Sequence, residues 1–543
     1  MAVVSFKKKD LEDLIGKRLT ENILKNRLPM MGCPLENMNE EEVEFEVFPN
    51  RPDLLSTEGF ARSVRYFLGL SKDLEEYETK KSGIELKREG KVKVRPYITA
   101  GVVKNVDLNE NILKSLMQLQ EKIHETFGRK RKKVAIGIHD LDKVKPPFTY
   151  KAVKPEEVEF TPLQSEEVMN LKEIKEKHPK GKYAGVLEGG KKWPIIVDKN
   201  NEVLSFPPVI NGKLTQLTSE TKNLFLDITG TDKKAIDQAL NLVATTLAER
   251  DGKIETVEVN NKLKPNFENR KIKVDLNYIN KTLGLELSEE KIKGLIEGMG
   301  FGYDDGNVTI PVYRTDIMHP IDIVEDIAIR YGYNNFEPEI PEVSGIGKPD
   351  GIQEFSDIIK DMMIGYGFQE VTTPIFTNKE DQFDKMEMEE EEVAEAENAL
   401  NENYYACRKY ILPQLMDVLK QNKHRSYPQK LFEVEDIVKL DNKAETGATN
   451  VRKLAAVVSD ETINYTDLAS KIEFILNNFD VKYTLKENNL KKFIEGRSAK
   501  ILVQNKEIGV IGEIDPKVLE NWSLERPVVA FEINLEKIKN IQD

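Results

Sequence analysis

The densest group of side chains that could carry out chemistry lies in the segment RTDIMHPIDIVED, which contains four carboxylates. Pro320 marks the expected start of a helix, because proline fits the first helical turn. At about 100° per residue, Asp322, Glu325 and Asp326 then fall within an arc of about 100°. Asp316 lies just upstream and can fold back over the same face. The spacing therefore predicts a cluster of three or four carboxylates.

Such a cluster has three interpretations. Closely packed carboxylates repel one another unless a cation lies among them, and hard oxygen ligands suit Mg²⁺ or Ca²⁺ better than a transition metal. Acidic residues are also favoured at a helix N-terminus by the helix dipole, and this needs no metal. A nuclease with two metal ions would require a basic groove beside the carboxylates, and the neighbouring sequence contains none. Spacing alone leaves the first two open.

Two other groups of polar residues have both a structural and a functional interpretation. The basic run at 129–133, RKRKK, reads either as a solvated loop or as a contact for a phosphate backbone. His139 and Asp140 are adjacent, but a single His-Asp pair without a second histidine cluster is more typical of a structural role. The sequence contains no Gly-x-Ser-x-Gly elbow, which would mark a serine nucleophile. For any hydrolytic reaction we therefore expect an activated water rather than a covalent intermediate.

The elements that must position these residues divide the chain into four parts. Residues 1–90 begin with an amphipathic segment and a helix near Ser56. Residues 91–265 alternate strands and helices. Residues 266–341 read as helix, helix, strand and helix, which is typical of a small winged-helix-like domain. Residues 345–543 contain successive strands with few helices, which favours a mostly antiparallel sheet. The predicted fold class is α+β, in several domains.

Four segments carry more local expectations. Residues 71–90 are highly charged and are predicted to be a linker. Residues 368–376, FQEVTTPIF, are predicted to form one strand. The acidic residues 384–402 are expected to be a solvated loop or an exposed helix. The Pro/Gly-rich segment 338–351 is predicted to separate the third and fourth parts.

Composition narrows the class of protein. The chain has 543 residues, 39% hydrophobic and 32% charged, which is a globular balance. No apolar run approaches the roughly 20 residues that span a bilayer, so we expect no membrane association. The N-terminus has no secretory h-region, and two cysteines, Cys33 and Cys407, cannot form a disulfide framework, so we expect a cytoplasmic protein. The net charge of −14 excludes a protein coated by nucleic acid on all sides.

Nine segments, taken together, resemble one family. They occur in the family's order over nearly the whole chain, and they read FPNRPDLLSTEGFAR, AIGIHDLD, LFLDITGTD, YRTDIMHPIDIVEDIAIRYGYN, GYGFQEVTTPIF, RKYILPQLM, KLFEVEDIV, EGRSAKI and IGVIGEI. The chain is therefore similar to the beta subunits of phenylalanyl-tRNA synthetases of the archaeal and eukaryotic type. One such segment would be a weak signal, whereas nine in order are specific.

The resemblance implies a domain plan, a partner and a metal. The four parts above correspond to B1 (1–90), B3/B4 (91–265), B5 (266–341) and B6/B7 (345–543). The implied assembly has two alpha and two beta chains; the alpha subunit binds ATP and phenylalanine and charges tRNA(Phe). In the family's B5 domain four carboxylates bind Mg²⁺, and they match Asp316, Asp322, Glu325 and Asp326. The last is more often glutamate, so this chain is one methylene shorter there.

The fourth part resembles the catalytic fold of class II synthetases but lacks its ATP-binding motifs. Class II enzymes hold the triphosphate with arginines, which neutralise phosphate charge in the transition state. The strand KLFEVEDIV carries no arginine, and the closing segment lacks the glycines that let a nucleotide approach the backbone. Arg497 and Arg526 are expected to form a structural ion pair and an interface contact. We therefore expect this part to form an interface with the alpha subunit.

The second part resembles a domain that hydrolyses tyrosine wrongly attached to tRNA(Phe). An apolar phenylalanine pocket cannot strongly reject an isostere with one added hydroxyl, so a second sieve is useful. The segment LFLDITGTD matches the family's pocket strand, and Asp227 and Thr229 alternate onto one side of that strand. Gly230 would let a substrate approach the backbone, and Ser205 is a further candidate. Asp232 is instead a candidate helix cap.

Three functions remain in competition at this point. The leading hypothesis is a subunit that supports charging and also carries editing hydrolysis. The second is a binding and scaffold subunit whose pocket is inactive. The third is an independent metal-dependent nuclease.

Overall fold

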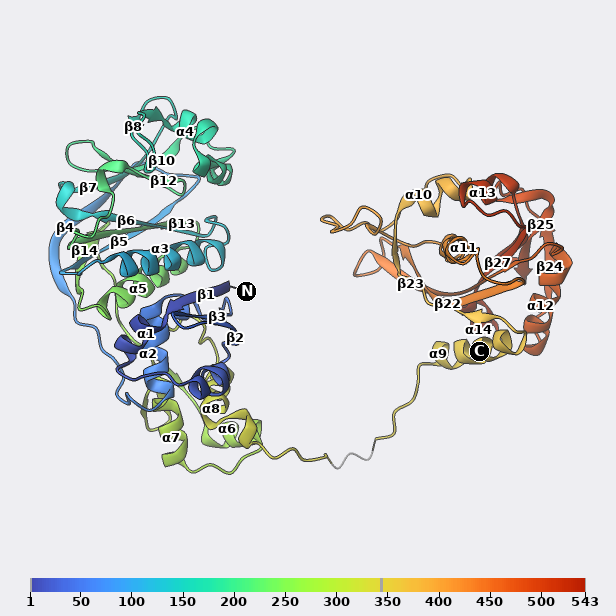
Figure 1. Ribbon diagram of the computed structural model, residues 1–543, viewed down its shortest axis with the longest axis horizontal. Helices are drawn as coiled ribbons and strands as arrows, with labels where there is room; N and C mark the ends of the chain where they lie inside the picture. The colour runs from blue at the N-terminus through green and yellow to red at the C-terminus, as the bar shows by residue number, and fades with distance from the viewer. Residues whose placement is uncertain (1, 342–344, 543) are drawn as a thin grey trace. The chain divides into compact units, whose positions relative to one another are not determined.

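The computed structural model describes residues 2–341 and 345–542, and the chain forms two compact units, residues 1–340 and 341–543 (Figure 1). The predicted Pro/Gly-rich break contains 342–344, which lie outside the described residues. Within the described ranges, no helix combines the length and the apolar character that crossing a bilayer requires.

The first unit begins with a small sheet and two helices. Its elements are β1 (Ala2–Lys7), α1 (Lys8–Ile15), β2 (Leu35–Met38), β3 (Glu42–Val47) and α2 (Thr57–Phe67), and the strand order is β1-β3-β2. Helix α2 begins as predicted, because the Ser56 side chain accepts a hydrogen bond from the amide of Gly59, at 3.0 Å. The amphipathic face of α2 buries Phe60, Val64 and Phe67.

A large sheet follows. Its elements are β4 (Lys80–Glu89), β5 (Tyr97–Lys104), α3 (Glu110–Glu125), β6 (Val134–Asp140), β7 (Phe148–Val153), β8 (Glu159–Phe160), β9 (Met169–Asn170), α4 (Leu171–Lys177), the 3₁₀ helix η5 (Pro179–Leu187), β10 (Trp193–Val197), β11 (Val203–Phe206), β12 (Ile210–Asn211), β13 (Leu224–Gly230), α5 (Lys233–Ala248), β14 (Lys253–Val259) and β15 (Lys262–Lys264). The sheet order is β12-β11-β10-β7-β4-β14-β5-β13-β6, with β15 on β14. Helices α3 and α5 and the N-terminal sheet share one hydrophobic core with this sheet.

The prediction of a linker at 71–90 is wrong for its second half. Residues 80–89 form β4, which pairs in parallel with both β14 and β7. Of its side chains only Leu86 is buried, so backbone hydrogen bonds rather than an apolar pattern hold the strand in the sheet. The sequence of β4 therefore lacks the hydrophobic alternation by which a strand is usually predicted.

The last part of the first unit is a three-stranded sheet with three helices. Its elements are β16 (Arg270–Lys273), α6 (Leu276–Leu283), α7 (Glu289–Glu297), β17 (Gly302–Asp304), β18 (Asn307–Ile310) and α8 (Pro320–Tyr331), and the strand order is β16-β18-β17. Ser288 caps α7 as expected, by accepting from the amide of Lys291. Pro320 is the first residue of α8, also as expected. The inner face of α8 buries Ile323, Val324 and Ile327.

The second unit is built on a seven-stranded sheet of order β19-β22-β23-β27-β26-β25-β24. Its elements are α9 (Gly351–Gly365), β19 (Gln369–Glu370), β20 (Phe376–Thr377), α10 (Lys379–Gln382), β21 (Ala406–Cys407), α11 (Leu412–Gln421), β22 (Gln429–Leu440), β23 (Ala448–Ser459), α12 (Tyr465–Asn478), β24 (Tyr483–Glu487), β25 (Phe493–Val503), β26 (Lys506–Ile514), α13 (Pro516–Asn521), β27 (Val528–Asn534) and α14 (Leu535–Gln542). Every pairing is antiparallel except β19 with β22. One face packs on α9, α12 and α14, and the other on α11 and α13 (Figure 1).

The single strand predicted at 368–376 is wrong: it is two short strands, β19 and β20, separated by a loop. Thr373 in this loop turns toward Glu433, which accepts hydrogen bonds from the Thr373 hydroxyl at 2.7 Å and from its amide at 3.2 Å. The Thr373 amide therefore cannot donate to a neighbouring strand, and the strand is interrupted here. The acidic segment 384–402 is largely exposed loop, as one of its two interpretations predicted.

Candidate active site

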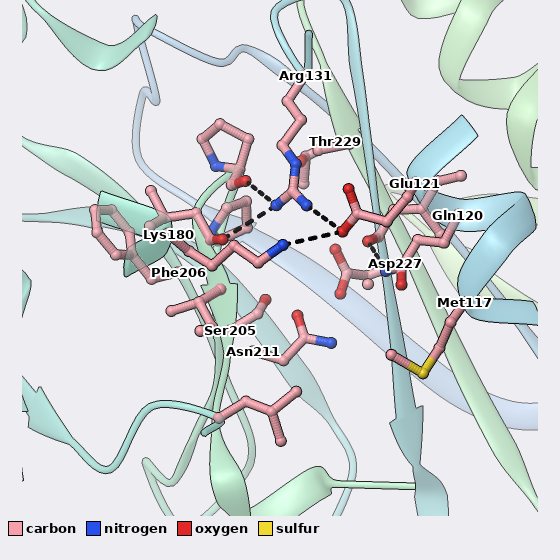
Figure 2. A pocket seen from close by; sticks show the side chains of 18 of the residues that line it. Met117, Gln120, Glu121, Arg131, Lys180, Ser205, Phe206, Asn211, Asp227 and Thr229 are labelled. Carbon is pink, nitrogen blue, oxygen red and sulfur yellow. Dashed lines mark hydrogen bonds and ion pairs between the residues drawn. The ribbon is translucent and has the colours of Figure 1, made fainter. Parts of the chain in front are cut away.

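The ten-stranded sheet curls until its two end strands meet. Asn211 on β12 donates from Nδ2 to the carbonyl oxygen of Ile138 on β6, at 3.3 Å. A pocket of about 120 Å³ lies at this seam, with α3 on one side, and it has room for several water molecules (Figure 2). Its lining includes the three residues predicted for an editing pocket, namely Asp227, Thr229 and Ser205.

Asp227 is held by a buried histidine. Its Oδ2 lies 2.7 Å from Nε2 of His139 on β6, and Nδ1 of His139 lies 2.7 Å from the Thr215 hydroxyl. A carboxylate only accepts, so Nε2 of the imidazole donates to it. Nδ1 faces the Thr215 hydroxyl, so the imidazole is held at both of its nitrogens. His139 and Asp140 do not act as a pair: Asp140 accepts from the Thr221 hydroxyl, at 2.8 Å.

Gly137 makes the contact between Asp227 and His139 sterically feasible. It lies directly opposite Asp227 in the antiparallel pairing of β6 with β13. A Cβ at this position would lie 2.0 Å from Oδ2 of Asp227 and 2.8 Å from Nε2 of His139. Any other residue would therefore displace the carboxylate from the imidazole.

Thr229 is fixed from behind by a buried guanidinium. Arg95 donates from Nε to the Thr229 hydroxyl at 2.7 Å and from Nη2 to the Thr229 carbonyl at 2.6 Å. Burial lowers the pKa of Arg95 to about 10. The Thr229 hydroxyl keeps its own hydrogen, so it can still donate into the pocket.

Ser205 has the least satisfied side chain of the three. It is 2% exposed, and its hydroxyl finds no hydrogen-bond partner anywhere in the described chain. A buried hydroxyl without a partner loses its hydrogen bonds to water and gains none in return, at a typical cost of about 1–3 kcal/mol. A water or a ligand in the pocket can supply the missing partner.

A second charged group lines the pocket and was not predicted as part of it. Arg131 donates from Nη1 to the carbonyls of Pro208 and Val209, both at 3.1 Å, and from Nη2 to Glu121 at 2.7 Å (Figure 2). Lys180 lies 3.4 Å from the same carboxylate. The interpretation of 129–133 as a wholly solvated loop is therefore wrong for Arg131, which is 6% exposed.

The pocket thus presents the Asp227 carboxylate, two hydroxyls and a group of two cations, Arg131 and Lys180, that share the carboxylate of Glu121. A carboxylate can accept a hydrogen bond from a water that attacks an ester, and hydroxyl donors can stabilise the oxyanion that forms. Asp232, considered as an alternative, instead caps α5 through the amide of Ala235, at 3.0 Å. It lies outside the pocket lining.

The predicted metal cluster lies elsewhere in the first unit. Nη2 of Arg314 lies 2.7 Å from Asp316 and 2.6 Å from Asp326. One oxygen of Asp322 accepts from the amides of Met318 and His319, both at 2.7 Å. Burial would lower the pKa of Arg314, but its two carboxylate partners raise it well above its usual value. A protein cation thus already lies between two of the four carboxylates.

The donor chemistry fits Mg²⁺ only in part. Asp316, Glu325 and Asp326 line one pocket of about 290 Å³. The pKa of Glu325 is raised by partial burial and then by Asp326, Asp322 and Asp316, which indicates uncompensated negative charge. Within the described ranges, however, no group of three or more possible ligands is arranged to hold a metal ion. In this cluster, Arg314 occupies both oxygens of Asp316.

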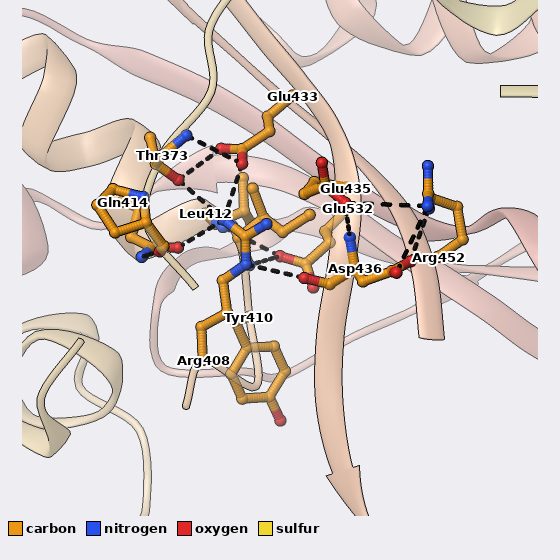
Figure 3. A network of polar contacts seen from close by, with 12 residues as sticks. Thr373, Arg408, Tyr410, Leu412, Gln414, Glu433, Glu435, Asp436, Arg452 and Glu532 are labelled. Atoms are coloured by element: carbon orange, nitrogen blue, oxygen red, sulfur yellow. Dashed lines mark hydrogen bonds and ion pairs between the residues drawn. The ribbon is translucent and has the colours of Figure 1, made fainter. Parts of the chain in front are cut away.

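The second unit contains a buried polar network on β22 (Figure 3). Arg408 is fully buried, and its Nη1 donates to Glu433 at 2.8 Å, to Thr373 at 2.8 Å and to Gln414 at 3.0 Å. Glu532 accepts from Lys453 at 2.6 Å and from two backbone amides. The carboxylates of Glu433 and Glu532 are therefore each paired with a cation inside the protein.

Arg497 and Arg526, expected to form a structural ion pair and an interface contact, each form an ion pair within the chain. Arg497 lies 2.7 Å from Glu513, and Arg526 lies 3.2 Å from Glu461. The guanidinium of Arg526 also stacks 4.0 Å above the ring of Tyr427.

Comparison with known proteins identifies the class. Three family models match: a B3/4 domain at 102–256, a tRNA synthetase B5 domain at 272–333 and a phenylalanyl tRNA synthetase beta chain CLM domain at 337–535. The whole pocket lining lies within the B3/4 match. These domains define the class as a tRNA synthetase chain.

Curated relatives specify the family. The phenylalanine–tRNA ligase beta subunit of Thermococcus sibiricus is 43% identical over 97% of both chains, and that of Methanocaldococcus jannaschii is 42% identical over 99% of this chain and 100% of the relative. An N-terminal fragment of the beta subunit from Pyrococcus horikoshii has 39% identity and a TM-score of 0.59, and it covers 61% of this chain and 99% of the fragment. The chain belongs to the family of phenylalanine–tRNA ligase beta subunits.

Besides Arg131 and Lys180, four residues of the site were not predicted as part of it: Glu121 and Gly137 line the pocket, and Arg95 and His139 hold Thr229 and Asp227 in place. Each acts across a long range, through strand pairing or through a buried side chain, so no local pattern marks it. One weak signal was available, because glycine inside the strand VAIGI indicates a close approach by a neighbour.

Proposed function

We propose that the pocket at the seam of the ten-stranded sheet hydrolyses tyrosine wrongly esterified to tRNA(Phe). The observation that carries this proposal is the buried, unpartnered Ser205 hydroxyl in the same pocket as Asp227. A site built to hydrogen-bond a hydroxyl rejects the analogue that lacks it, because its polar groups stay unpaired. A pocket of this kind distinguishes a tyrosyl from a phenylalanyl ester.

In the proposed reaction, Asp227 accepts a hydrogen bond from the attacking water and removes its proton. His139 holds the carboxylate in place through the other oxygen. The Thr229 hydroxyl, fixed by Arg95, donates to the carbonyl oxygen as it becomes an oxyanion. The ester bond breaks, tyrosine leaves, and the proton passes to the ribose hydroxyl.

Hydrolysis of two esters tests the proposal. The chain, purified with its alpha partner, is mixed with tyrosyl-tRNA(Phe) or phenylalanyl-tRNA(Phe), and the remaining ester is followed over time. We expect the tyrosyl ester to disappear much faster than in buffer and much faster than the phenylalanyl ester. Equal, buffer-like loss of both would instead support a scaffold subunit with an inactive pocket.

We further propose that charging takes place on an alpha subunit, in a tetramer of two alpha and two beta chains in the cytoplasm. ATP and phenylalanine would bind that partner. Support comes from β22, which carries no arginine and whose Glu433 is paired with the buried Arg408. The second unit then serves as the inactive, class II-like B6/B7 interface (345–543). The parts 1–90, 91–265 and 266–341 would be B1, B3/B4 and a winged-helix-like B5.

We also propose Mg²⁺ at the carboxylate cluster of Asp316, Asp322, Glu325 and Asp326. The support is chemical. The donors are hard oxygens, and burial together with the neighbouring carboxylates raises the pKa of Glu325, so a cation there would offset unfavourable negative charge. Bound there, the ion would neutralise excess charge between the helix α8 and the N-terminal part of the chain.

Replacement of Glu325 by glutamine tests the metal proposal without an activity assay. A raised pKa in the folded state means that ionised Glu325 destabilises the fold at neutral pH, so Glu325→Gln is expected to unfold at a higher temperature in EDTA. Added Mg²⁺ should raise the melting temperature of the wild type and have little effect on the variant. An equal response to Mg²⁺ in both proteins would contradict the proposal; Glu290→Gln, on the exposed start of α7, is the control.

A further inference from the structure

We propose that a groove between the N-terminal helices and α7 binds the phosphate groups of a small anion, either free diphosphate or a nucleoside diphosphate. Two arginines supply its cations: Arg27 ends the π-helix η1 (Ile23–Arg27), and Arg330 lies in the last turn of α8. The groove has a volume of about 750 Å³, and residues of α7 form its other wall. Among the described residues it shares no lining with the pocket of Asp227, so the inference is independent of the hydrolysis proposed there.

The two arginines lack counter-charges. Among the described residues, neither Arg27 nor Arg330 forms an ion pair or a side-chain hydrogen bond, and Nε of Arg330 is buried without a partner. Burial lowers the pKa of Arg330, and the positive charge of Arg27 lowers it further. The chain has 94 acidic residues, yet none of them compensates this pair. A bound anion would supply both the missing charge and the missing acceptors.

An aromatic ring holds both guanidinium groups in place. The Cζ atom of Arg27 lies 4.7 Å from the centre of the Phe67 ring on α2, and that of Arg330 lies 5.9 Å from the same centre. Attraction to the ring face positions a cation without using its N–H donors. The negative end of the α8 dipole favours a cation at Arg330, but it gives no reason for a second one beside it.

A glycine makes room for Arg330. A Cβ at Gly298, which follows the last residue of α7, would lie 2.4 Å from Nε of Arg330. The guanidinium therefore lies against bare backbone at this position. Its place in the groove is set by packing, before any ligand binds.

The remaining lining favours phosphate over a single carboxylate. Lys291 on α7 is exposed and adds a third cation, whereas Glu290 is the acidic residue of the lining, so positive charge is in excess. A guanidinium binds two oxygens of an anion side by side, and two guanidinium groups with an ammonium require more oxygens than one carboxylate has. Phosphate groups provide them. The half-exposed ring of Tyr331 also lines the groove and offers a surface for a nucleotide base.

Calorimetric titration with sodium diphosphate tests the groove. The full chain is used without an alpha partner, so that no ATP site contributes, and EDTA removes metal ions. Arg27→Gln/Arg330→Gln is compared with wild type and with Arg18→Gln/Arg425→Gln, a control that removes two exposed arginines that form no ion pair in the described chain. Far-UV circular dichroism and the melting temperature without ligand show whether each protein is folded.

The wild type and the control are expected to bind diphosphate with the same Kd. The groove variant should bind at least about tenfold more weakly, because each lost guanidinium removes charge-assisted hydrogen bonds. Without ligand it should melt no lower than the wild type, since the repulsion between the two cations is gone. An unchanged Kd in the groove variant would overturn the proposal, as would equal binding of succinate or of chloride at the same ionic strength.

Gly298→Ala tests the geometry while every charge is kept. The backbone of Gly298 has φ −66°, which alanine adopts without strain, so the variant should fold. Its methyl group displaces the Arg330 side chain, and the Kd for diphosphate should lie between those of the wild type and the double variant. A wild-type Kd in Gly298→Ala would show that charge alone attracts the anion and would contradict a built site.

A parallel titration with ADP separates the two sources of phosphate. Tighter binding of ADP than of diphosphate would assign the groove to a nucleotide, with its base on Tyr331, and tighter binding of diphosphate would assign it to the free ion. Either result supports a phosphate site. Binding of neither compound by the folded wild type would overturn it.

Discussion

Asp227→Asn is expected to slow hydrolysis of tyrosyl-tRNA(Phe) by about 10²–10⁴-fold, with the fold intact. Asparagine has the same size and its amide oxygen can still accept from Nε2 of His139, so the packing survives. It cannot remove a proton from water, so the chemical step is lost. The measurement is the single-turnover rate constant with enzyme in excess over the ester.

Asp232→Asn is the matched control for this prediction. Asp232 lies five residues further along the chain and caps α5 outside the pocket, and asparagine is an equally good cap. Its hydrolysis rate should equal that of the wild type. Full activity of Asp227→Asn would exclude Asp227 as the base and would leave the substrate's own groups to activate the water.

Arg408→Met is expected to lower the free energy of unfolding of the second unit by about 3–5 kcal/mol. The substitution leaves Glu433, which is 1% exposed, with a buried charge and no cation beside it. The Thr373 hydroxyl and Gln414 also lose the guanidinium that joins them (Figure 3). Urea unfolding of the full chain, followed by the fluorescence of Trp522 in this unit, gives the change.

Two further variants make this prediction specific. Arg408→Met/Glu433→Met removes both charges and should be more stable than the single variant, because no uncompensated carboxylate remains. Arg497→Met breaks an ion pair of similar length at an exposed position and should leave unfolding nearly unchanged. Equal stability of Arg408→Met and Arg497→Met would contradict the importance assigned to the buried network.

The candidate pocket was predictable where local rules apply and unpredictable where pairing is long-range. Strand alternation alone placed Asp227 and Thr229 on one side of β13. Ser205 was a further candidate, and the curl of the sheet brings it to the same pocket. His139 was considered only together with its neighbour Asp140, because only the register of β6 with β13 shows that it lies beside Asp227.

For the carboxylate cluster, too, the sequence predicted the local positions but not the long-range contacts. Helical periodicity correctly placed the acidic residues near the start of α8. It gave no indication that Arg314 would lie between Asp316 and Asp326, because the side-chain direction of a loop residue is set by tertiary packing. Charge compensation inside a fold therefore has to be read from the structure.

The fold itself followed the hydrophobic pattern wherever that pattern decides the structure. Helix α2 and the strands β6 and β13 were found because their burial is periodic or continuous. Strand β4 was missed because only one of its ten residues is buried, so it shows no hydrophobic pattern. The strand expected at 368–376 was broken by side-chain bonds from Glu433, sixty residues away in the chain.

The decisive experiment is a structure of the chain and its alpha partner with a non-hydrolysable 3′-tyrosylamino analogue of the tRNA terminus. We expect the tyrosyl group at the seam of β6 and β12, with Ser205 hydrogen-bonded to the analogue and Asp227 facing its carbonyl carbon. Density for the analogue at any other place, with the seam filled by water alone, would contradict it.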